Sequence, residues 1–193
     1  MLGRVALFWC KTRVFGTCCA AIVQPRNLIS LKQMNTNKRW VCVLGTNHLY
    51  QDEAYRKGYF LEVRDVLSTY KVDFVGEEYS KATASQSYAQ RLVEKEYPTT
   101  SWKNVDLTRS ERQKIPDKNP TGLGPVQDLD FQIAREKAWV DRVSAGTKQS
   151  ALLICGLAHT FSVSQRFRDA RFEVEVRVFL DGKDHQAIRE RVE

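Results

Sequence analysis

The 193-residue sequence contains no apolar run that approaches the roughly 20 residues required for a membrane-spanning helix. It has no Gly-x-Gly-x-x-Gly, no Gly-x-x-x-x-Gly-Lys-Ser/Thr and no Gly-x-Ser-x-Gly. Nothing therefore indicates a dinucleotide-binding loop, a P-loop or a serine-hydrolase nucleophile elbow. None of the five cysteines forms a Cys-x-x-Cys pair, which leaves a thiolate zinc site and a dithiol redox motif unsupported.

Acidic residues are absent from the first 51 positions, which carry seven Lys or Arg, whereas the remainder balances 23 basic against 23 acidic residues. The net charge of +7 therefore belongs to the N-terminal segment. A nucleic-acid-binding domain needs a basic face of its own, so we expect no nucleic-acid partner.

Residues 1–33 differ from the rest of the chain, because they hold three of the five cysteines and show no helical or strand periodicity. Three interpretations compete: an organellar presequence, a weak secretory signal, and a start site assigned too far upstream. We favour the third, since Met34 begins a polar lead into the first expected strand. The expected organisation is thus an N-terminal extension, 1–33, and a single domain, 34–193, located in the cytoplasm.

Apolar runs and helical periodicity alternate along residues 40–178. Strands are expected at 40–45, 72–75, 151–156 and 172–178, and helices at about 51–69, 80–96, 110–114, 128–145 and 161–170. The alternation predicts an α/β fold with a mostly parallel central sheet of about four strands flanked by helices. The last strand alternates strictly, which is typical of an edge strand.

Two of the three histidines occur in the same context, a Gly-x-x-His tetrapeptide that follows an apolar run. These are Gly45 with His48 and Gly156 with His159. Ligands of open α/β sheets bind beyond the carboxyl ends of the strands. We therefore expect both imidazoles at one rim, with each glycine allowing a sharp turn and close approach.

An acidic pair, Glu77 and Glu78, follows the second expected strand. Adjacent residues in extended chain point to opposite sides, so at most one of the two faces the pocket. Two imidazoles and a carboxylate, such as His48, His159 and Glu77, could hold Mn²⁺, Co²⁺ or Zn²⁺ with a position open for water. Without a metal, one histidine would act as general base and the other would stabilise or protonate.

Arg135 and Arg142 lie two turns apart on one face of the long helix that precedes the third expected strand. Either guanidinium could clamp a carboxylate or stabilise an oxyanion.

Because of these residues and their order, the chain resembles a compact member of the Tiki/TraB and erythromycin-esterase-like superfamily, which includes ChaN-like haem-binding lipoproteins. The resemblance covers roughly residues 40–180. Its matching positions are Gly45 with His48, Glu77 or Glu78, Arg135, and Gly156 with His159. It implies hydrolysis, either metal-dependent peptide cleavage or metal-free ester hydrolysis. The chain lacks the large helical insertions of bigger members.

The sequence thus favours a hydrolase of an ester or amide bond in a small molecule or peptide, with His48, His159, Glu77 or Glu78, and Arg135 in the site. The alternative is a non-enzymatic domain that binds a metal, haem or a small anion. A third interpretation makes both histidines structural caps at strand ends.

Overall fold

A computed structural model describes residues 38–52, 57–79, 86–115 and 129–180. Within this part of the chain, five strands form one wholly parallel sheet in the order β3-β2-β4-β1-β5. Their bounds are Trp40–Thr46 (β1), Phe74–Glu77 (β2), Ser101–Asn104 (β3), Ser150–Gly156 (β4) and Glu173–Val178 (β5). The predicted α/β class is confirmed, and β5 lies at an edge as expected.

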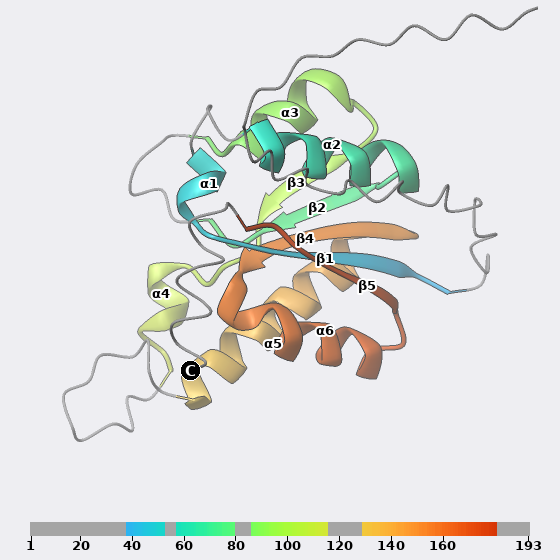
Figure 1. Cartoon of the computed structure of the whole chain (residues 1–193). Helices are drawn as coiled ribbons and strands as arrows, with labels where there is room; N and C mark the ends of the chain where they lie inside the picture. The colour runs from blue at the N-terminus through green and yellow to red at the C-terminus, as the bar shows by residue number, and fades with distance from the viewer. Residues whose placement is uncertain (1–37, 53–56, 80–85, 116–128, 181–193) are drawn as a thin grey trace, which may run out of the picture. The chain divides into compact units, whose positions relative to one another are not determined.

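Helices cover both faces of the sheet, with α2 and α3 on one side and α5 and α6 on the other (Figure 1). The longer helices are Lys57–Tyr70 (α2), Tyr88–Glu96 (α3), Leu129–Gly146 (α5) and Thr160–Asp169 (α6). Short helical turns occupy Leu49–Asp52 (α1), Arg109–Arg112 (α4) and Leu157–His159 (η2). No helix in the described ranges combines the length and apolarity needed to cross a membrane.

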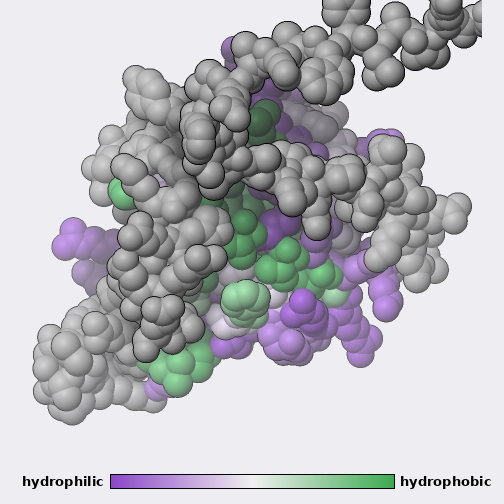
Figure 2. Space-filling model, viewed as in Figure 1, coloured by the Kyte–Doolittle hydropathy of each residue, from purple (hydrophilic) through white to green (hydrophobic). Residues whose placement is uncertain are grey.

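The central strands are buried on both faces, which explains their continuous apolar runs. Alternate side chains of β1 and β4 pack under α5 and α6, including Val41, Val43 and Leu153 against Trp139 and Phe167. Apart from the exposed Phe161, the outer side of α6 is hydrophilic (Figure 2). Cys42 and Cys155 are buried, and burial raises the pKa of both thiols, which disfavours the reactive thiolate.

The sheet contains one strand that the sequence pattern does not predict, β3, because it lies in a stretch that shows no apolar run. Its side chains alternate between exposed and half-buried, since β3 is the other edge of the sheet. The helix expected from Ser80 begins instead at Tyr88, because Ser87 has extended backbone and its Oγ caps the amide of Gln90 at 3.0 Å. Ser80 itself lies outside the described residues.

Backbone proximity divides the chain into two units, Met1–Met34 and Asn35–Glu193. All described residues belong to the second unit. Residues 1–33, for which three interpretations compete, lie outside the described ranges.

The strand register brings the ends of the two Gly-x-x-His strands side by side. Gly45 pairs with Cys155 and Thr46 with Gly156, so β1 and β4 end at the same level. The ladder between β2 and β4 continues past Glu77, because the amide of Glu78 donates to the carbonyl of Ile154 at 2.8 Å. The carboxyl edge of the sheet therefore gathers both motifs and the acidic pair.

At the amino ends of the strands, Asp73 binds the loop that joins α5 to β4. One carboxylate oxygen accepts from Thr147 Oγ1 at 2.7 Å, and the other accepts from the amides of Gln149 at 2.8 Å and Ser150 at 3.2 Å. A single side chain thus satisfies several polar groups of a partly exposed turn, which ties β2 to the start of β4.

We expect Asp73→Ala to lower the free energy of unfolding by about 2 kcal/mol, because amides of the loop lose their acceptor. Urea denaturation followed by circular dichroism measures this. Asp169→Ala, at an exposed carboxylate near the end of α6, is the matched control and should change stability by less than about 0.5 kcal/mol. Equal effects of the two substitutions would contradict the role given to Asp73.

Candidate functional site

His48 stands at the carboxyl end of β1 with about half of its side chain exposed, 52%. Its Nδ1 lies 3.1 Å from Oε1 of Gln51, and its Nε2 lies 3.6 Å from Oε2 of Glu78. The first distance is a hydrogen bond, whereas the second is too long for one. The ring is therefore held from the Nδ1 side and presents Nε2 beside a carboxylate.

The two adjacent glutamates point to opposite faces of the sheet, as the strand geometry predicts. Glu78 faces α5, where its Oε1 accepts from Arg135 Nη2 at 2.5 Å and its Oε2 from the amide of Gly156 at 2.8 Å. Glu77 faces the α3 side, where it accepts from Ser87 Oγ and from Trp102 Nε1. Glu78 is thus the member of the pair that belongs to the rim with His48.

Arg135 links Glu78 to a second carboxylate, that of Asp106, which follows β3. Its Nε donates to Asp106 Oδ1 at 3.0 Å and its Nη2 to Asp106 Oδ2 at 3.1 Å, a paired arrangement that fixes the plane of the guanidinium. Trp139 Nε1 and Arg112 Nη2 also donate to Asp106. Because Arg135 is only 9% exposed and donates to both carboxylates, it positions Glu78 and offers little to a substrate.

The protonation states of this cluster are fixed by its own charges. Burial by itself would raise the pKa of Asp106, but the hydrogen bonds and charge of Arg135 outweigh it and hold that pKa below its ordinary value. Burial likewise opposes the charge of Arg135, yet Asp106 and Glu78 raise its pKa. A charged guanidinium and a charged Asp106 therefore persist at neutral pH.

His159 belongs to a different cluster, at the start of α6. Its Nδ1 lies 2.9 Å from Oε1 of Glu136, and its ring packs edge-on against Trp139 with centroids 4.9 Å apart. Glu136 also accepts from Ser162 Oγ at 2.6 Å and from Arg166 Nε at 2.9 Å. Burial would raise the pKa of Glu136, but these donors lower it overall, so the carboxylate stays ionised.

Each of the two motif glycines lies against a side chain from the region of the other motif, so that neither position has space for a Cβ atom. A Cβ on Gly156 would stand 2.6 Å from Nε2 of His48, and a Cβ on Gly45 would stand 2.0 Å from Oγ1 of Thr160, the residue after His159. Gly156 itself has extended backbone, φ −62° and ψ 145°, which any residue can adopt. The expectation of a sharp turn at this glycine is wrong, because what glycine supplies here is space between neighbouring strand ends.

The structure brings His48, Glu78 and Arg135 together, whereas Glu77 lies on the other face and His159 is bound to Glu136. Within the described ranges, no hydrogen bond or ion pair joins the two imidazoles. No three His, Cys, Asp or Glu side chains there come close enough to form a metal-binding group. Of the expected ligand set His48, His159 and Glu77, the structure places Glu77 on the opposite face of the sheet from Glu78 and His48.

Sequence reasoning missed three residues of the site. Gln51 follows His48 at a helical spacing of three, and Glu136 adjoins Arg135, so both had a positional signal. Asp106 had little signal, because it follows an edge strand that the sequence pattern hides. Arg142 is structural: its Nη1 donates to the carbonyls of Val105 and Asp106 at 2.8 and 2.5 Å, which fastens the segment after β3 to α5.

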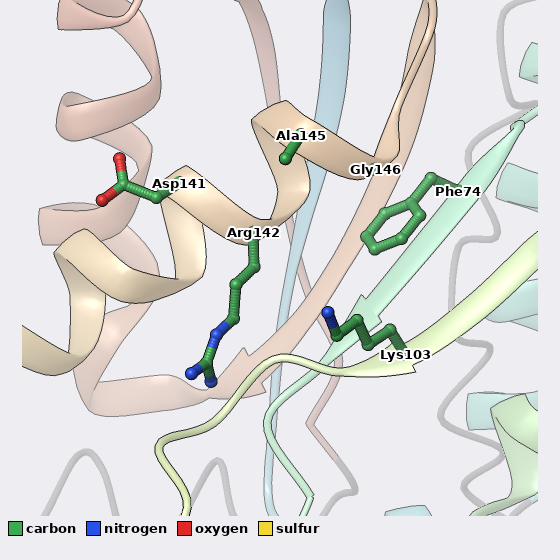
Figure 3. A pocket seen from close by; sticks show the side chains of 6 residues that line it. All are labelled: Phe74, Lys103, Asp141, Arg142, Ala145 and Gly146. Carbon is green, nitrogen blue, oxygen red and sulfur yellow. The ribbon is translucent and has the colours of Figure 1, made fainter. Parts of the chain in front are cut away.

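A surface hollow of about 310 Å³ lies elsewhere, between the end of α5 and the edge of the sheet (Figure 3). It is lined by Phe74, Lys103, Asp141, Arg142, Ala145 and Gly146. Phe74 begins β2 and Gly146 ends α5, so the hollow opens away from the carboxyl ends of β1 and β4. None of the charged groups around His48 or His159 lines it.

No protein-family model, no curated protein and no solved structure matches the chain. The arguments about this site therefore rest on its own residues.

The two motif glycines differ in what an added methyl group would meet, and this gives a paired prediction. Gly45→Ala should destabilise the fold by about 2 kcal/mol, because Thr160 is buried in the packed start of α6. Gly156→Ala should cost less than about 1 kcal/mol, since the half-exposed His48 ring can move aside. Urea denaturation compares the two, and the His48 ring signals should shift only in Gly156→Ala. A larger loss of stability for Gly156→Ala would contradict this.

Acid should weaken the Arg135 cluster. Because the folded state lowers the pKa of Asp106 below its ordinary value of 3.8, its contribution is present above that pH and is lost as pH falls through the lower folded value. Asp106→Asn should cost about 3 kcal/mol at neutral pH and flatten the acid limb of the stability curve. Denaturation between about pH 2 and 7 measures both. The exposed Asp141→Asn is the control, and an acid limb as steep in Asp106→Asn as in the parent would oppose the assignment.

Proposed function

We propose that the chain is a hydrolase in which His48 is the general base and Glu78, held by Arg135, stabilises the imidazolium that forms. The observation that carries this proposal is that Nε2 of His48, a half-exposed side chain, lies 3.6 Å from the buried carboxylate of Glu78. A water molecule about 2.8 Å from both atoms fits that spacing geometrically. The proposed substrate is an ester or amide of a small molecule or peptide.

In the proposed reaction, Nε2 of His48 removes a proton from water as the water oxygen bonds to the carbonyl carbon. The positive charge that develops on the ring faces the carboxylate of Glu78, which lowers the energy of the charged state. When the tetrahedral intermediate collapses, the bond to the leaving group breaks and that group takes up the proton from Nε2 of His48, which returns to its neutral form. The products are a carboxylic acid and an alcohol or amine.

Two features support a base over a purely structural histidine. A structural cap is expected to be enclosed, but His48 is the more exposed of the two motif histidines, 52% against 13% for His159. The groups around His48 also form a chain of contacts. Glu78 lies beside His48, Arg135 donates to Glu78, and Asp106 accepts from Arg135. Such backing of one side chain by the next is typical of positioned catalytic groups.

We assign His159 no proton-transfer step in this proposal. Its Nδ1 donates to Glu136 in a separate cluster, and a neutral ring bonded in this way carries no proton on Nε2 to give. The resemblance to the erythromycin-esterase-like branch agrees with a mechanism based on histidine and glutamate.

We expect His48→Ala to lower turnover by at least about 100-fold on an esterase and peptidase panel, because general-base catalysis typically contributes that much. Glu78→Gln should lose less, since the ring remains while its countercharge is removed. His185→Ala, at the third histidine, is the control and should retain full activity.

The same panel needs protein purified without a histidine tag, with metal content measured in parallel. Equal turnover of wild type and His48→Ala in every assay, with no bound ion, would contradict the proposal. A ligand retained through purification without any turnover would favour the binding-domain alternative instead.

A further inference from the structure

Gln51 is a glutamine buried to 1% exposure at the carboxyl edge of the sheet, three residues after His48. A side-chain amide buried this far must find partners for both of its ends. Its Nε2 donates to the main-chain carbonyl of Glu78 at 3.0 Å, and its Oε1 lies 3.1 Å from Nδ1 of His48. One side chain therefore connects the proposed base to the residue that carries its carboxylate.

The orientation of this amide follows from chemistry. A carbonyl oxygen accepts hydrogen bonds but cannot donate them, so the group facing Glu78 must be the NH₂ end of Gln51. The oxygen end then faces His48 and can only accept. A hydrogen bond between them requires the hydrogen of the ring to be on Nδ1.

The opposite nitrogen of His48 also faces an acceptor, Oε2 of Glu78 at 3.6 Å. A neutral imidazole carries one N–H and can satisfy only one of these two acceptors. If the hydrogen were on Nε2, it would point toward the carboxylate, and the lone pair on Nδ1 would face the oxygen of Gln51, which cannot donate. The contact at 3.1 Å is a hydrogen bond and the contact at 3.6 Å is not, so the geometry favours the hydrogen on Nδ1.

We propose that Gln51 is a positioning residue that selects the Nδ1–H form of His48 and so keeps Nε2 as the proton acceptor. Its catalytic consequence rests on the proposed hydrolase function, but the selection itself does not. Because the same amide holds the carbonyl of Glu78, Gln51 also fixes the imidazole relative to the carboxylate that faces it.

The test is nitrogen-15 NMR of the histidine rings at a pH where His48 is neutral, with assignments taken from His48→Ala and His159→Ala. We expect the wild-type spectrum to show a protonated Nδ1 and an unprotonated Nε2 at His48. Gln51→Met has nearly the same volume and removes both hydrogen bonds, so it should shift His48 toward the Nε2–H form. Turnover should fall roughly 10- to 100-fold, the usual loss when a supporting hydrogen bond to a site histidine is removed.

Gln90→Met is the matched control, because Gln90 lies on α3 and bonds through its amide to Glu94 away from the rim. It should leave the His48 signals and turnover unchanged. A wild-type ring protonated on Nε2 would overturn the proposal even if Gln51→Met failed to fold, and so would an unchanged tautomer in a folded Gln51→Met. A wild-type protein with the expected tautomer but no turnover on any substrate would refute the hydrolase proposal and leave the selection by Gln51 intact.

Discussion

The buried guanidinium of Arg135 is the constraint on which the carboxyl edge depends. A charge this deep is costly unless it is paired, and here it is matched by Glu78 from the end of β2 and Asp106 from the segment after β3. Three elements that are far apart in sequence are thereby held at fixed distances. Removing Arg135 would take the paired cation from the buried Glu78, and removing either carboxylate would leave Arg135 with one anionic partner instead of two, which makes the cluster cooperative.

The second constraint is steric. The ends of β1 and β4 lie at the same level in the sheet. The space beside Gly156 is occupied by His48, and the space beside Gly45 by Thr160, the residue after His159. The recurrence of Gly-x-x-His is therefore partly a packing solution for two neighbouring strands that both turn into helices. This explains a repeated tetrapeptide without requiring that the two histidines perform the same task.

The two imidazoles in fact have different environments. His48 is half exposed and bonded to a neutral amide, whereas His159 is largely enclosed and bonded to the carboxylate of Glu136. Both rings are held through Nδ1. The proposed function assigns the general base to His48 because that ring is half exposed, whereas His159 is enclosed and bonded to a carboxylate.

The sequence by itself determined the α/β class, four of the five strands (β1, β2, β4 and β5) by their apolar or alternating pattern, and the end of the sheet at which the site residues gather. The sequence is sufficient for this because buried parallel strands have continuous apolar sequences, and because the carboxyl ends of parallel strands lie at the same end of the sheet. It also determined that Glu77 and Glu78 diverge, since strand side chains alternate. Only the tertiary structure decided which glutamate faces His48, because that depends on which helix packs on which face. The same holds for β3, Asp106 and Gln51: an edge strand has no apolar signature, and hydrogen bonds between distant segments depend on strand order and register, neither of which a local pattern records.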